Sequence, residues 1–210
     1  MRFNAASARA VVSCSVYCSD LGILTMVRNL KKQITVAMYD QSKNFYMAVG
    51  HGISHWSRME ECLVQVVARL LRTSEAKAGL VMYSIMSFHA WITIIDELFE
   101  LDGTYKNSLQ AWRKLMESLK TENDIRVRLA HHSISQEMKR VPTRGQDNQF
   151  SLQIQAYLRP GKFDTRTKTA KLTFRPLTKS EIEDFADRVE DIHEKLILLL
   201  ALMRKQKSLR

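Results

Sequence analysis

The stretch TKSEIEDFADRVEDIHEKLILLLALM, residues 178–203, decides the fold of this 210-residue chain. It opens with Thr178 and Glu181, whose three-residue spacing is the capping-box pattern of a helix start. Apolar residues then recur at steps of three and four, which is the spacing of one helix face. They are Ile182, Phe185, Val189, Ile192, Leu196, Leu199 and Met203. We therefore expect a long amphipathic helix here, in a mainly α fold.

A first helical pattern upstream begins near Phe45. Its apolar stripe consists of Ile53, Trp56, Leu63, Val67 and Leu70. Glu60 falls in the same series, and a carboxylate that faces a core is costly unless it is paired or kept near water. We expect Glu60 to support an ion pair.

Two more helices are expected between residues 73 and 120. The second starts at Thr73 or Ser74 and carries an apolar line at 85, 92 and 99 that also contains His89 and Asp96. We interpret His89 as a core histidine. The third helix spans about residues 105–120, and residues 121–123 open a short fourth segment. The tryptophans at 56, 91 and 112 fit the buried stripes.

The pattern changes to a period of two after residue 142. Phe150 to Leu158 alternates apolar and polar residues, and a second alternation surrounds Phe174, after a turn at Pro160. We expect a β-hairpin insertion at about residues 148–176, before the C-terminal helix. Residues 1–40 show no clear periodicity, so we expect a loosely ordered N-terminal arm, followed by one helical domain over residues 41–210.

The positive charge is localised. The net charge is +10, and the region from Lys139 to Arg175 holds nine basic residues against two acidic ones. This field favours a polyanionic partner such as RNA. The candidate phosphate contacts are Arg159, Lys162, Arg166, Lys168, Lys171 and Arg175. The alternative is an ordinary solvated loop.

Three cysteines, at 14, 18 and 62, are an odd number that argues against a disulfide framework and favours a reducing compartment. No apolar run approaches the roughly 20 residues of a membrane-spanning helix. We therefore expect a cytoplasmic protein with no membrane partner.

The segment IRVRLAH, residues 125–131, sets Arg126 five residues before His131. Imidazole, with an ordinary pKa of roughly 6.5, can exchange protons near neutrality. A guanidinium can bind two phosphate oxygens and stabilise their growing charge. Five residues of helix turn two side chains about 140° apart, so convergence requires a helix end or a second copy. A second match, Arg188 to His193, lies among acidic residues, and we interpret it as a solvated helix face.

Four segments together resemble the HEPN superfamily and look like its bacterial members: ISHWSRMEE at 53–61, SFHAW at 87–91, IDEL at 95–98 and IRVRLAH at 125–131. The resemblance implies an antiparallel helical bundle, commonly a homodimer, that cleaves RNA without a metal or other cofactor. It also implies a role in toxin–antitoxin or phage-defence systems, with an antitoxin or another protein as a possible partner.

Carried onto this chain, the resemblance makes Arg126 and His131 the catalytic residues, with Glu60, Asp96 and His132 in support. The position after the arginine is usually polar in active members, whereas this chain has Val127. The alternatives are therefore a catalytically inactive RNA- or nucleotide-binding module, or a protein-interaction module that uses the seam of the C-terminal helix. In the structural alternative, Arg126 pairs with Glu60 or Asp96, and Arg128 and His132 only decorate a helix end.

Overall fold

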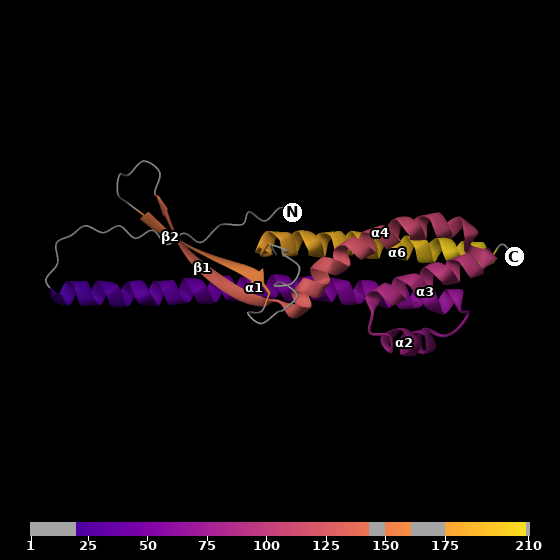
Figure 1. Cartoon of the computed structure of the whole chain (residues 1–210), viewed down its shortest axis with the longest axis horizontal. Helices are drawn as coiled ribbons and strands as arrows, with labels where there is room; N and C mark the ends of the chain where they lie inside the picture. Colours follow the sequence, from indigo (N-terminus) through magenta and orange to yellow (C-terminus); the bar gives the residue numbers. More distant parts are fainter. Residues whose placement is uncertain (1–19, 143–149, 161–174, 209–210) are drawn as a thin grey trace, which may run out of the picture. The chain divides into compact units, whose positions relative to one another are not determined.

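The computed structural model describes residues 20–142, 150–160 and 175–208 (Figure 1). Over these residues the chain is mainly α-helical with one small antiparallel sheet, which confirms the predicted fold class at that level. The elements are α1 (Asp20–Leu70), α2 (Glu75–Tyr83), α3 (Phe88–Leu101), a 3-10 turn (Gly103–Tyr105), α4 (Lys106–His131), β1 (Ser133–Pro142), β2 (Phe150–Arg159) and α6 (Lys179–Ser208).

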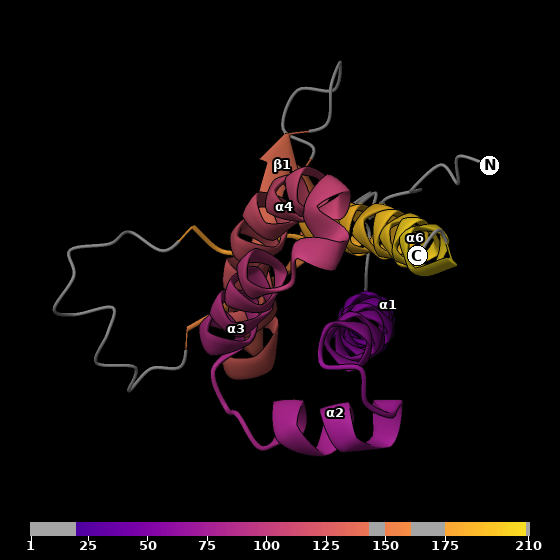
Figure 2. The same cartoon turned by 90° about the vertical axis from the view of Figure 1, so that its right-hand side faces the viewer.

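The chain divides into two compact units. The sheet unit combines Met1–Ala48 with His132–Lys179, and the helical unit combines Val49–His131 with Ser180–Arg210. In the helical unit, α1, α6, α4 and α3 follow one another around the core, and α2 lies outside them next to α1 (Figure 2).

The core of the helical unit is aromatic. The ring of Trp56 lies 4.8 Å from that of Phe88 and is stacked on Phe185 at 6.2 Å, while Phe99 is stacked on Trp112 at 5.6 Å. Such pairs add about 0.5–1.5 kcal/mol each to the burial of their area. The predicted core role of all three tryptophans is confirmed, since Trp91 is also buried.

The seam of the C-terminal helix belongs to this core. Ile182, Phe185, Val189 and Leu196 are fully buried within the chain itself. A protein partner could not use that seam while the helical unit stays folded. The exposed apolar residues of α6 are Ile197, Leu198 and Leu202, which lie off the seam.

The predicted helix boundaries are partly wrong. Ser74 caps α2 as expected, but the helix expected to reach Phe99 is broken, because Ser87 caps a separate α3 by accepting the N–H of Ala90. Conversely, the expected third and fourth segments form one helix, α4. Thr121 does not start a new helix there, since its hydroxyl donates to the carbonyl of Glu117 one turn earlier.

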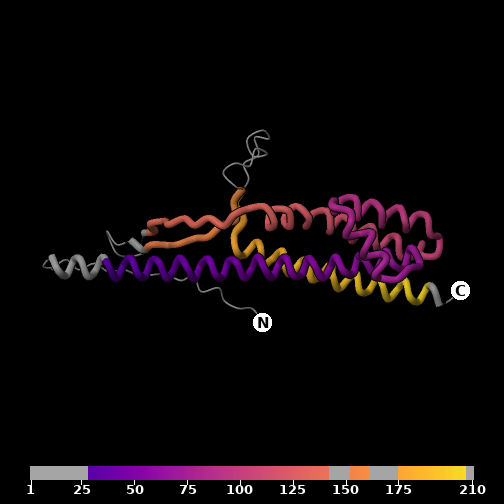
Figure 3. The backbone as a smooth tube through the Cα atoms, turned by 90° about the horizontal axis from the view of Figure 1, so that it is seen from below, coloured from indigo at the N-terminus to yellow at the C-terminus, as the bar shows by residue number. Residues whose placement is uncertain are grey.

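The sheet unit contains a strand that the sequence analysis did not predict. β2 occupies the predicted strand and pairs antiparallel with β1, which precedes it, with Ser133 opposite Arg159 and Pro142 opposite Phe150. The alternation of β1 is interrupted at Gln136. The amide of that residue donates to the carbonyl of Met38 at 2.6 Å and to the hydroxyl of Ser42 at 2.7 Å. Figure 3 shows both strands running side by side along the early part of α1.

The other half of the predicted hairpin, around residues 170–174, lies outside the described residues. Among the described residues, Leu177 forms an antiparallel bridge with Leu158 of β2.

The expected loose arm over residues 1–40 is wrong for its second half, because α1 starts at Asp20. Residues 23–49 contain neither glycine nor proline, so helix propensity is uninterrupted there even without a core-facing stripe. Residues 1–19 lie outside the described part of the chain.

Cys62 is the one cysteine of the three that the structure describes, and it is a buried free thiol on α1. Burial raises the pKa of this thiol, and the charge of Glu61 adds to that effect.

Candidate functional site

Arg126 lies near the C-terminal end of α4, where it contacts two residues of α1. Its Nη2 is 3.6 Å from Oε1 of Glu60, and its guanidinium carbon is 5.8 Å from the centre of the Trp56 ring. About a third of the side chain is exposed, at 32%. Arg126 is therefore oriented by α1 while part of its guanidinium faces solvent.

Glu60 is the residue that fixes this arrangement. Its Oε1 accepts the indole N–H of Trp56 at 2.7 Å, and its side chain is only 15% exposed. Burial raises the pKa of the Glu60 carboxyl, while the Trp56 hydrogen bond and the charge of Arg126 act in the opposite direction. The structure thus brings together Glu60 and Arg126, as we expected for a supporting or structural ion pair.

His131 is exposed and is the last residue of α4. It follows Arg126 by five residues, which corresponds to about 7.5 Å along the helix and about 140° around it. Within one chain the two side chains therefore leave α4 in different directions. They meet over one phosphate if a second copy supplies one of them, or if the end of the helix at His131 turns that imidazole back toward Arg126.

The other expected supporting residues are placed differently. Asp96 accepts the indole N–H of Trp112 at 3.1 Å, so its observed role is to satisfy a buried tryptophan. His132 follows α4 and belongs to the sheet unit. His89 is exposed on α3, which makes its interpretation as a core histidine wrong.

The interpretation of Arg188 and His193 as a solvated face holds for Arg188, whose side chain is 48% exposed, but it is wrong for His193. Arg188 forms a two-pronged bond to Glu122 of α4, with Nε to Oε1 at 2.7 Å and Nη2 to Oε2 at 3.1 Å. The Glu122 side chain is 7% exposed, and its hydrogen bond raises the pKa of Arg188. His193 is itself buried, at 8% exposure. This part of α6 therefore carries a half-exposed arginine that binds a buried carboxylate of α4.

A cluster of imidazoles that the sequence reasoning missed lies between α1 and α6. We call it the histidine cluster, and its members are His51, His55, Arg58, Glu190 and His193. Nδ1 of His55 is 2.6 Å from Oε2 of Glu190, and its Nε2 is 2.8 Å from Nε2 of His51. Arg58 approaches the same carboxylate at 3.3 Å, and His193 at 3.9 Å.

The histidine cluster has the connections of a proton relay. An ionised carboxylate only accepts, so Nδ1 of His55 carries the proton that binds Glu190. In neutral His55, Nε2 then accepts the Nε2–H of His51, whose Nδ1 remains as an acceptor on an exposed ring. The available signal was the spacing of His51, His55 and Arg58 on one helix face. Glu190 lies 135 residues from His55, which no local pattern reveals.

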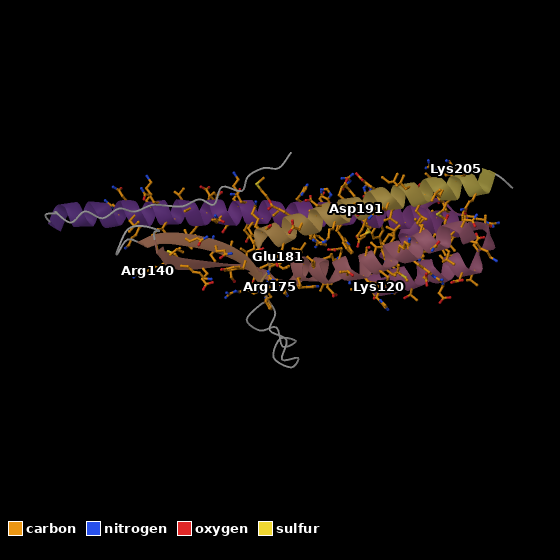
Figure 4. All side chains as sticks on the ribbon, turned by 90° about the horizontal axis from the view of Figure 1, so that it is seen from above. Lys120, Arg140, Arg175, Glu181, Asp191 and Lys205 are labelled. Carbon is orange, nitrogen blue, oxygen red and sulfur yellow. The ribbon has the colours of Figure 1, made fainter. Side chains whose placement is uncertain are left out.

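The predicted phosphate contacts are only partly described. Arg159 is exposed at the end of β2, with its guanidinium 5.4 Å from the centre of the Tyr157 ring and 3.9 Å from Glu137. Arg175 is exposed as well, and Figure 4 labels it together with Arg140 of β1. The remaining four lie outside the described residues: Lys162, Arg166, Lys168 and Lys171.

Among the helices that the structure describes, none has the length and apolarity needed to cross a bilayer. Within the same residues, no group of three or more His, Cys, Asp or Glu side chains is arranged to hold a metal ion.

Comparisons with known proteins add no relative to this geometry: no protein-family model, no curated protein and no solved structure matches the chain.

Proposed function

We propose that the chain is a HEPN-like endoribonuclease that cleaves RNA without a metal, acting in the cytoplasm as a homodimer. Arg126 binds the scissile phosphate and His131 transfers a proton. The observation that carries the proposal is the end of α4, where Glu60 and Trp56 hold a partly exposed Arg126 and His131 is exposed one and a half turns later. A toxin–antitoxin or phage-defence role rests on the family resemblance alone.

The proposed reaction needs one base, one acid and one cation. His131 takes the proton of a ribose 2′-hydroxyl, whose oxygen forms a bond to the adjacent phosphorus. The bond from phosphorus to the 5′-oxygen breaks, and that oxygen receives a proton from an imidazolium, which leaves a 2′,3′-cyclic phosphate. Arg126 stabilises the additional negative charge on the phosphate oxygens in the transition state.

In the proposed mechanism, a dimer brings an Arg126 side chain and a His131 side chain to the same phosphate. The two side chains diverge by about 140° on one helix, and in the proposed dimer Arg126 of one copy acts with His131 of the second copy. The Glu60 contact leaves donors for this task, because a distance of 3.6 Å to one carboxylate oxygen does not occupy the five N–H groups of a guanidinium.

The test is cleavage of a fluorescent single-stranded RNA in EDTA by purified wild type and four single variants. We expect Arg126→Ala and His131→Ala to lose at least about 100-fold in rate, the lower range for general acid–base catalysis. His89→Ala is the matched control, since it removes an exposed histidine from α3. Wild-type activity in His131→Ala would refute the assignment. If His51→Ala lost cleavage activity while His131→Ala kept it, proton transfer would be assigned to the histidine cluster instead.

A second candidate function is RNA binding without cleavage. The observation that favours it is the Glu60–Arg126 ion pair, because a carboxylate that already neutralises the cation weakens its hold on a phosphate. Val127 also favours this candidate, because active members of the family that the chain resembles usually have a polar residue at that position. In that case RNA stays intact in the same assay, while its affinity falls steeply with salt as phosphate contacts are screened.

A further inference from the structure

A pocket in the helical unit is lined by three arginines and shares no residue with the sites described above. Its volume is about 390 Å³, which falls in the range of small-molecule sites. We call it the arginine pocket. Its lining consists of Gln65, Ala68, Arg69, Arg72, Thr73, Glu75, Tyr105, Met203 and Arg204.

Arg69 and Arg204 place two like charges in this lining. Arg69 donates from Nη1 to the carbonyl of Leu200 at 2.6 Å, and a carbonyl carries no net charge to balance it. Burial lowers the pKa of Arg69 and the charge of Arg204 lowers it further, while Tyr105 and the charge of Glu75 act in the opposite direction. Within the part of the chain that the structure describes, neither guanidinium forms an ion pair with a carboxylate. Figure 4 labels the neighbouring Lys205, which adds another cation near the end of α6.

Arg72 is held in an unfavourable backbone conformation beside the same pocket. It lies in the turn two residues after the end of α1, with φ at 53°, the left-handed region that glycine occupies most readily. The chain reverses there through bonds from Arg72 N to the Arg69 carbonyl at 3.2 Å and from Thr73 N to the Ala68 carbonyl at 2.9 Å. Its exposed guanidinium lies 3.7 Å from Asp102 and 3.4 Å from the hydroxyl of Thr104. An arginine at a position suited to glycine indicates that its side chain is used.

We propose that the arginine pocket binds a phosphate group, carried by a nucleotide or by RNA. Planar guanidinium groups bind phosphate through paired N–H donors, and a dianion between Arg69 and Arg204 would replace their mutual repulsion with two attractions. Glu75 offsets one of the three positive charges, which leaves a net positive lining. The volume exceeds that of a phosphate and leaves space for an attached sugar or base. This site is independent of the RNA cleavage proposed for α4.

The test is calorimetric titration of the full chain at low salt with inorganic phosphate, AMP, succinate and a short single-stranded DNA that cannot be cleaved through a 2′-hydroxyl. Three variants each remove one positive charge. Arg204→Gln and Arg72→Gly alter the pocket, whereas Arg113→Gln is the matched control, because Arg113 is an exposed residue of α4 that pairs with Glu100. Thermal unfolding of each variant is measured in parallel.

We expect a phosphate-bearing ligand to bind wild type, and Arg204→Gln and Arg72→Gly each to weaken that binding about tenfold or more, with Arg113→Gln unchanged. Arg72→Gly should do so without loss of thermal stability, which separates ligand binding from a structural role. Binding of AMP and phosphate alike assigns the site to free nucleotides, and binding of the oligonucleotide alone assigns it to nucleic acid. The proposal is overturned if no phosphate compound binds, if succinate binds equally well, or if Arg113→Gln weakens binding as much.

Discussion

Alanine at Gly52 and alanine at Gly50 are expected to change the stability of the helical unit in opposite directions. Both glycines lie inside α1, two residues apart. A Cβ at Gly52 would meet Cδ1 and Cε1 of Phe185 at 3.2 and 3.3 Å, whereas a Cβ at Gly50 has nothing within 4 Å. Comparing the two variants therefore distinguishes the effect of helix propensity on stability from the effect of packing, at nearly the same place in the helix.

The magnitudes follow from these distances. Either substitution gains about 0.8–1.0 kcal/mol of helix propensity. At Gly52 the ring of Phe185 must retreat, but this ring is fully buried and stacked on Trp56. Overpacking of that kind costs about 1–3 kcal/mol. We expect Gly50→Ala to be up to about 1 kcal/mol more stable than wild type. The net effect of Gly52→Ala is a loss of up to about 2 kcal/mol.

Urea unfolding followed by tryptophan fluorescence measures the difference. The three tryptophans, at 56, 91 and 112, all lie in the helical unit, so the signal reports that unit. Circular dichroism of the native proteins serves as the control for an intact fold. If Gly52→Ala were as stable as Gly50→Ala, α1 would not pack against Phe185 as closely as described. The placement of His55 against Glu190 across the same two helices would then lose its support.

Three further outcomes can be checked by the same measurement. Arg188→Ala should cost about 1–3 kcal/mol, because it leaves the buried carboxylate of Glu122 without its partner. Replacing Glu122 by leucine in that variant should restore most of the lost free energy of unfolding, and a cost near zero would contradict the burial of this carboxylate. Burial raises the pKa of Glu60 above its ordinary value of 4.5, so the folded protein binds the Glu60 proton more tightly than the unfolded chain does. The stability that comes from this proton is present at low pH and is lost as the pH rises through the folded-state pKa. The free energy of unfolding of Glu60→Gln, relative to that of wild type, should therefore increase between about pH 4 and neutrality. If this difference became smaller as the pH rises, burial of the Glu60 carboxyl would be excluded as its cause. Arg72→Gly should be stabilised by up to about 1 kcal/mol, since glycine relieves the left-handed strain while only an exposed ion pair is lost; destabilisation would show that the pair outweighs the strain.

Local patterns predicted the elements whose cause is local. The helix that follows Thr178, the cap at Ser74 and the strand from Phe150 depend on spacing within a few residues, and the structure confirms all three. The strand β1 was missed because the side chain of Gln136 is used to bond α1, which breaks the apolar alternation. A residue chosen for a contact with a distant helix leaves no periodic signal.

The candidate site shows the same division. The pairing of Glu60 with Arg126 was expected because a carboxylate in an apolar stripe needs a cation, which is a requirement visible in the sequence. The partner of Arg188 was missed because the acidic residues next to it in sequence suggested only a solvated face, whereas Glu122 lies 66 residues away. The charge next to a residue in sequence does not identify the charge that faces it in space.

The buried thiol of Cys62 gives this protein an intrinsic reporter of its own opening. Alkylating reagents attack only the thiolate, and burial makes that form both scarce and inaccessible here. The modification rate of the peptide that contains Cys62 would therefore measure how often α1 separates from the rest of the helical unit. Fluctuations of the fold could then be followed by mass spectrometry without an introduced label.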